Sequence, residues 1–143
     1  MKLNPTIIID TREQQPYEFK GLITERATLK TGDYSVKGHE NTFAIERKSL
    51  NDWVHSITQD RDRFEREIKR AKESLMFFAI IIESDMRKVW KEKLFSKVSK
   101  ASIVNTAILW QMRYNIPIIW GSNRTQSAYI IKTMCDNIDK YGF

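Results

Sequence analysis

Cysteine, glycine and proline are scarce in this chain of 143 residues. The single cysteine, Cys135, excludes an internal disulfide framework and a zinc site built on several cysteines. Five glycines and three prolines, beside 41% hydrophobic and 29% charged residues, exclude a collagen-like or low-complexity chain. What remains is the composition of one globular domain, and a chain of this length buries about 70% of its unfolded surface without a disulfide or metal.

Long apolar runs are missing as well. The run over residues 77–82 is far too short to cross a bilayer, and residues 1–5 do not lead into the apolar stretch of a signal peptide. The phosphate-binding pattern Gly-x-x-x-x-Gly-Lys is absent, which excludes an ATP motor and predicts no nucleotide cofactor. We therefore expect a soluble, cytoplasmic protein without a membrane partner.

Positive charge is concentrated in the second part of the chain. The total is 24 basic and 18 acidic residues, a net charge of +6. Residues 1–60 contain 8 basic and 9 acidic side chains, whereas residues 61–143 contain 16 and 9. A basic surface is a weak indication of nucleic-acid binding, and its uneven distribution suggests that one region would carry the contacts.

Apolar periodicity and capping residues predict an α/β fold. We expect strands over residues 6–10, 26–30, 34–37, 42–48, 76–83 and 116–120. We expect helices that begin at residue 49, cover 61–74, 85–94 and 124–141, and run from Ser99 or Ser102 to residue 114. The order, strands first and then alternating helices and strands, predicts a mixed central sheet flanked by helices.

Acidic and basic side chains are brought together by the strand over residues 42–48. Alternate residues of a strand share a face, so Glu46 and Lys48 point the same way, about 6–7 Å apart along the strand. A hairpin turn before this strand would place Asp33 beside them, and Asp10 closes the first strand as a further carboxylate. Such a pocket suits hydrolysis of a phosphodiester with Mg²⁺, a hard cation that prefers carboxylate oxygens.

Spacing alone leaves a structural alternative for each of these residues. Glu46 and Lys48 also fit an exposed strand pair, Asp33 a turn residue after a glycine, and Asp10 the end of a strand. Asp52, three residues after Ser49, also fits the first turn of a helix, where an acid complements the helix dipole.

Three longer segments carry a resemblance to a known family. In order along the chain they are Ile7-Ile8-Ile9-Asp10-Thr11-Arg12-Glu13, then Gly32-Asp33-Tyr34, then Glu46-Arg47-Lys48-Ser49-Leu50-Asn51-Asp52. Together they resemble the nuclease domain of the XPF family of structure-specific endonucleases, whose hallmark is Gly-Asp followed at a distance by Glu-Arg-Lys-x-x-x-Asp. The resemblance spans nearly the whole chain, so we expect residues 1–143 to form a single XPF-type nuclease domain.

The resemblance implies a restriction-endonuclease-like fold and cleavage of branched DNA, such as flaps, forks or junctions, with Mg²⁺ or Mn²⁺. It implies metal ligands at Asp33 and Glu46, a further acid near the metal at Asp10, and a water- or phosphate-positioning role for Lys48. The resemblance also implies a catalytic role for Arg47. It implies supporting roles for Arg12, Glu13 and Asp52.

DNA contacts are predicted mainly from the basic segment 87–100, in which apolar residues alternate with six cations and a single acid. A solvated helix face is the alternative for this segment. On the preceding helix, Arg63 is the cation at the family's position, while its neighbours fit i,i+4 ion pairs. The candidate DNA-binding residues are Arg63, Lys88, Lys91, Lys93, Lys97 and Lys100.

Other functions stay open at this point. A catalytically silent DNA-binding or dimer-partner domain is the main alternative, although the motif acids are all present. A sequence-specific restriction enzyme would normally need more chain for base recognition. The apolar faces of the last two helices fit core packing or, as the resemblance implies, a homodimer interface. Family members usually also contain a helix-hairpin-helix module and often a helicase domain, and we expect neither here; a solitary nuclease domain would suit a phage.

Overall fold

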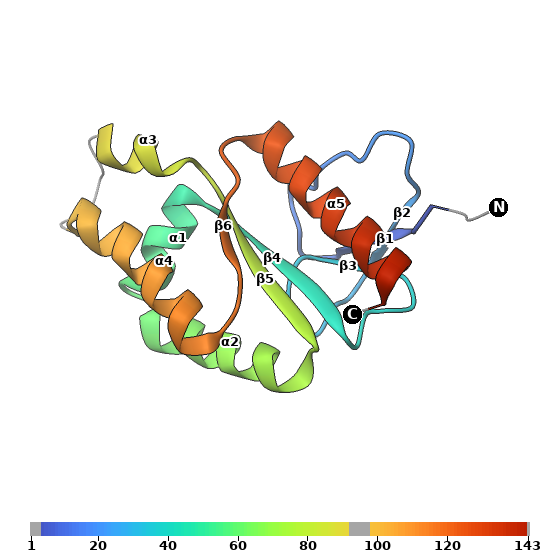
Figure 1. Ribbon diagram of the computed structural model, residues 1–143, viewed down its shortest axis with the longest axis horizontal. Coiled ribbons are helices and arrows are strands. Elements are labelled where there is room, and N and C mark those ends of the chain that lie inside the picture. The colour runs from blue at the N-terminus through green and yellow to red at the C-terminus, as the bar shows by residue number, and fades with distance from the viewer. Residues whose placement is uncertain (1–3, 92–97, 143) are drawn as a thin grey trace.

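A single six-stranded mixed sheet forms the centre of the molecule in the computed structural model, which describes residues 4–91 and 98–142 (Figure 1). The strands are β1 (Ile7–Asp10), β2 (Thr24–Ala27), β3 (Tyr34–Val36), β4 (Phe43–Ser49), β5 (Phe77–Glu83) and β6 (Ile118–Trp120). Their order across the sheet is β2-β1-β3-β4-β5-β6. β3 pairs antiparallel with both of its neighbours, and the other three pairings are parallel.

Helices cover both faces of this sheet. They are α1 (Leu50–Ile57), α2 (Arg61–Ser74), α3 (Met86–Lys91), α4 (Lys100–Tyr114) and α5 (Arg124–Tyr141). α5 lies across one face, while α1, α2 and α4 lie on the other (Figure 1). The predicted α/β fold with a mixed sheet between helices is therefore confirmed.

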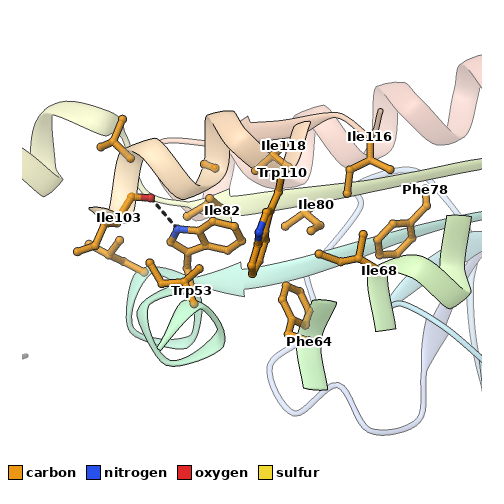
Figure 2. Packing of buried hydrophobic residues seen from close by; sticks show 14 of the residues in the cluster. Trp53, Phe64, Ile68, Phe78, Ile80, Ile82, Ile103, Trp110, Ile116 and Ile118 are labelled. Carbon is orange, nitrogen blue, oxygen red and sulfur yellow. Dashed lines mark hydrogen bonds between the residues drawn. The ribbon is translucent and has the colours of Figure 1, made fainter. Parts of the chain in front are cut away.

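The sheet separates two hydrophobic cores, one on each face, because alternate residues of a strand point to opposite faces. On the α5 face, Ile131 and Cys135 pack against Tyr34 and Ile45 of the sheet. On the other face, the largest buried side chains are aromatic: Trp53 of α1 and Trp110 of α4 meet edge to face with ring centroids 5.4 Å apart. The indole of Trp53 also donates a hydrogen bond to the carbonyl of Ile103 at 3.2 Å, which joins α1 to α4 (Figure 2).

Helix positions follow the sequence closely. α2 and α5 have the expected bounds, and the expected cap at Ser49 is present, since its hydroxyl accepts a hydrogen bond from the Asp52 backbone N–H at 3.1 Å. Ser99 caps α4 in the same way, through the N–H of Ser102. Across the described residues, 4–91 and 98–142, no helix is long and apolar enough to span a membrane.

One strand is misplaced in the prediction. The second strand was expected over residues 26–30, but β2 covers Thr24–Ala27, and Leu29 instead binds the Asp10 side chain through its N–H. β2 is an exposed strand at the edge of the sheet, so it lacks the alternation of buried and exposed residues that defines a strand in sequence. The expected end of the third helix, at residue 94, lies outside the described residues.

Candidate active site

The β3–β4 hairpin brings Asp33, Glu46 and Lys48 together, as the sequence predicts. Tyr34 pairs with Ile45, so Asp33 lies beside Glu46 at the open end of the hairpin. The Asp33 N–H donates to the Ile45 carbonyl at 2.8 Å, and the Asp33 carboxylate accepts from the Arg47 N–H, also at 2.8 Å. These two bonds fix the carboxylate against the strand that carries Glu46.

Gly32 makes this approach possible. Its φ of +83° is unfavourable for other residues, and a Cβ at this position would lie 3.0 Å from the Cβ of Ala44 and 3.1 Å from the Ile45 carbonyl oxygen. A side chain here would push the Asp33 turn away from β4. The Gly-Asp of the motif is therefore a geometric requirement of the hairpin.

A pocket of about 490 Å³ opens over these side chains, between the hairpin and α2. Its acidic lining is Asp10, Asp33, Glu46 and Glu67, and its basic lining is Arg12, Lys30, Lys48, Arg63 and Arg70. The acids of the hairpin thus share one pocket with five basic side chains, a combination that can hold a metal and a phosphate at once.

Burial raises the pKa of both hairpin carboxyls. For Asp33, burial outweighs the hydrogen bond from the Arg47 N–H, and the charge of Glu13 acts in the same direction as burial. For Glu46, burial and then the charge of Asp33 raise the pKa well above its ordinary value, and Lys48 offsets only part of this. The two carboxylates thus repel each other in a half-buried site.

Lys48 is held between a carboxylate and an aromatic ring. Its Nζ lies 3.7 Å from Oε2 of Glu46 and 4.4 Å from the ring centroid of Phe64 on α2. Phe64 is buried, and its ring also contacts Trp110, with centroids 5.9 Å apart. The ammonium of Lys48 is therefore oriented by Phe64, on the α2 side of the hydrophobic core.

Asp10 lines the pocket, but both of its carboxylate oxygens accept hydrogen bonds from other groups of the protein. Its carboxylate accepts hydrogen bonds from the Arg12 side chain at 2.8 Å and from the Leu29 N–H at 2.8 Å. Burial alone would raise the pKa of Asp10, but these hydrogen bonds outweigh it and lower the pKa. Asp10 thus holds Arg12, whose side chain is 68% exposed, at the pocket. A metal-ligand role for Asp10 stays a prediction.

The Arg47 side chain lies on the opposite face of the sheet. Its guanidinium contacts Glu13 at 3.3 Å and Glu83 at 3.1 Å and lies 4.3 Å from the ring centroid of Tyr17. Neither Arg47 nor Glu13 lines the pocket. The structure therefore does not bring the Arg47 side chain to the site where a catalytic role was expected, because strand alternation turns it away; its backbone N–H, however, binds Asp33.

Asp52 and the basic segment also lie apart from the pocket. Asp52 is exposed in the first turn of α1, where its N–H completes the Ser49 cap. Lys88 and Lys91 of α3 line a separate hollow with Asp85 and Arg87, and Lys100 donates to the carbonyl of Trp90 at 2.7 Å. Lys93 and Lys97 lie outside the described residues. DNA contact through this segment stays a prediction.

Sequence reasoning missed several lining residues. Lys30 comes from the loop before Gly32, and Phe64, Glu67 and Arg70 come from α2. The signal for Arg70 was its spacing of seven from Arg63, which places both on one face of a helix. No sequence signal shows that this face lies over β4.

The two hairpin carboxylates suit a hard divalent cation. Their oxygens are the donors that Mg²⁺ and Mn²⁺ prefer, and their mutual repulsion is what a bound cation would relieve. In the described parts of the chain, no group of three or more histidine, cysteine, aspartate or glutamate side chains is arranged to hold a metal. Asp33 and Glu46 would hold such a cation together with water, and Asp10 as a further ligand stays a prediction.

A family model, the ERCC4 domain, matches residues 9–134. The chain belongs to the ERCC4 family. This is a family of nucleases, in agreement with the XPF resemblance of the sequence motifs. The match covers the hairpin, α2 and most of α5, so the candidate site lies within the family's domain. No curated protein matches the chain.

Solved structures show the same fold. XPF from Aeropyrum pernix is similar with a TM-score of 0.76 and 19% sequence identity, over 96% of this chain and 66% of that one. A second structure, of the same protein in complex with DNA, is similar with a TM-score of 0.77 and 20% identity, again over 96% and 66%. The ERCC4 chain thus has the restriction-endonuclease-like fold and spans about two thirds of the length of these relatives.

Proposed function

We propose that this protein is a metal-dependent endonuclease that hydrolyses phosphodiester bonds in DNA. The observation that carries the proposal is the convergence of Asp33, Glu46 and Lys48 in one pocket, which further cations also line. A catalytically silent member of the family would have no need to keep two mutually repelling, half-buried carboxylates beside an oriented lysine.

Each side chain has a distinct role in this reaction. Asp33 and Glu46 would hold Mg²⁺ or Mn²⁺, which lowers the pKa of water and neutralises phosphate charge when bound. Lys48 positions the attacking water and stabilises the charge that develops on the phosphate. The water oxygen bonds to phosphorus as the bond from phosphorus to the sugar oxygen breaks; water gives up a proton and the leaving oxygen gains one. Arg12 and Lys30 bind the flanking phosphates.

We propose branched DNA, such as flaps, forks and junctions, as the substrate class, and DNA repair or recombination as the setting. The family membership supports this choice, as does the DNA complex of the Aeropyrum pernix relative.

The test is cleavage of labelled flap, fork, Holliday-junction and linear duplex DNA with Mg²⁺, Mn²⁺ or EDTA. Glu46→Gln and Asp33→Asn should abolish cleavage, while Glu25→Gln, a change of the same type on the exposed strand β2, should leave it unchanged. Binding of every substrate by the wild-type protein without cleavage of any would overturn the proposal in favour of the silent domain. Equal cleavage by Glu46→Gln would show a contaminating nuclease.

We also propose a homodimer formed through the last two helices. The supporting observation is that α4 exposes Ile108, Leu109 and Met112, of which Met112 is 78% exposed. Sedimentation of the wild-type protein should show a dimer that Met112→Lys converts to monomer. A monomer at all concentrations would refute this assembly.

A further inference from the structure

A row of cations lies along the exposed face of α2. This basic ridge consists of Arg63, Arg66, Lys69 and Arg70, all exposed. The opposite face of the helix, with Phe64, Ile68 and Ala71, is buried. From the first to the last residue of the ridge the helix rises about 10.5 Å, which matches about three phosphates of one DNA strand measured along the duplex axis.

The ridge is continuous with the active-site pocket. A second hollow, of about 340 Å³, is lined by the four ridge residues and Glu73. Arg63 and Arg70 line both this hollow and the pocket that contains Asp33 and Glu46. A chain of phosphates that passes through the pocket can therefore continue over these two arginines onto the outer face of α2.

Most of the charge on the ridge is uncompensated. Arg63 is neutralised by Asp60 and Glu67, with its NH1 2.7 Å from Oε1 of Glu67, so these pairs hold it at the edge of the pocket. In contrast, within residues 4–91 and 98–142, Arg66, Lys69 and Arg70 form no ion pair. The expectation that most cations of this helix form i,i+4 pairs is therefore wrong for these three. An uncompensated row of cations is suited to a polyanion.

We propose that the basic ridge binds the sugar–phosphate backbone of the DNA arm next to the scissile phosphate, so that the substrate leaves the active site along α2. This inference rests on the proposed nuclease function, which supplies the phosphate in the pocket. The inference gives α2 two functions. Its buried face orients Lys48 through Phe64, and its exposed face binds the DNA arm.

The test measures binding in EDTA, where it is independent of cleavage. Fluorescence anisotropy of labelled flap DNA at 50–200 mM salt compares the wild type with the double variant Arg66→Gln/Lys69→Gln. The matched control is Lys132→Gln/Lys140→Gln on α5, across the sheet from the pocket (Figure 1). Loss of two phosphate contacts should lower the slope of log affinity against log salt by about 1.8. Over this fourfold range of salt, wild-type affinity should therefore fall about 12-fold more than that of the variant.

The outcomes separate this inference from the proposed function. The proposed role of the ridge would be overturned by an unchanged salt slope in the ridge variant, or by an equal decrease of the slope in the α5 control. Either result would count even if the wild type cleaves DNA. A lower slope in the ridge variant alone would support DNA contact along α2, and this contact would stand even if no substrate were cleaved and the nuclease proposal failed. In an active protein, the ridge variant should raise KM with kcat nearly unchanged, because Arg66 and Lys69 lie outside the pocket that holds the reacting phosphate.

Discussion

Replacing Glu46 with glutamine should stabilise the metal-free protein. The Glu46 side chain is 18% exposed, and burial and the charge of Asp33 raise its pKa well above the ordinary value. The attraction of Lys48 at 3.7 Å amounts to about 4.5 kcal/mol at an effective dielectric constant of about 20. The direction of the pKa shift means that desolvation and repulsion together exceed this attraction. Glutamine keeps the shape of the side chain and removes both unfavourable effects.

The gain in stability should depend on pH. A carboxyl whose pKa is higher in the folded than in the unfolded protein makes folding less favourable as pH rises above the unfolded pKa, about 4.3 for glutamate. At pH 4 the wild type and Glu46→Gln should therefore unfold at similar temperatures. Above the raised folded pKa of Glu46, we expect the variant to be more stable by about 1–2 kcal/mol, or about 2–8 °C in Tm.

Thermal unfolding in EDTA between pH 4 and pH 9 measures this difference. Glu25→Gln is the control, because the Glu25 side chain is 45% exposed in a surface ion pair with Lys37. Saturating Mg²⁺ should reverse the order, because Glu46→Gln removes one of the two side chains proposed to hold the metal. A ligand present at 100 times its Kd stabilises a protein by about 2.7 kcal/mol. A variant that melts at or below the wild type at pH 8 in EDTA would refute the reasoning.

Three further changes test single contacts. Phe64→Leu should lower kcat while Phe64→Tyr retains it, because only an aromatic ring orients the Lys48 ammonium; steady-state kinetics would show equal kcat for both if the ring is irrelevant. Gly32→Ala should destabilise the protein by about 1–3 kcal/mol in denaturant titrations and weaken metal binding, and an unaltered midpoint would contradict the tight turn before Asp33. Ser49→Ala should lower the free energy of unfolding by about 1 kcal/mol without changing kcat, and a larger effect on kcat than on unfolding would contradict a purely capping role.

The parts of the fold that local sequence determines were predictable. The bounds of α2 follow from the helical spacing of Phe64 and Ile68, and the shared face of Glu46 and Lys48 follows from strand alternation. The convergence with Asp33 needed only a short hairpin. These features depend on residues close together in the chain, so pattern and turn chemistry suffice.

What the sequence did not predict depends on contacts between distant segments. The hydrogen bond between the Asp10 carboxylate and the Leu29 N–H joins residues that are 19 positions apart, and it depends on the path of the loop between them. Likewise, Phe64 and Arg70 reach the pocket because α2 packs against β5 and α4, an arrangement that local periodicity does not encode. Strand β2 was misplaced for a related reason, since its position depends on pairing with β1 rather than on burial.

The burial of Cys135 makes the chain well suited to site-directed labelling. It is the only cysteine in the sequence, it is fully buried on the inner face of α5, and burial raises the pKa of its thiol to about 12, so little thiolate is available to react. A cysteine introduced on the surface would thus be the single reactive thiol, with no need to remove the native one. A nitroxide or dye attached through Glu73→Cys, beside the ridge, would report directly how close a DNA arm comes to α2.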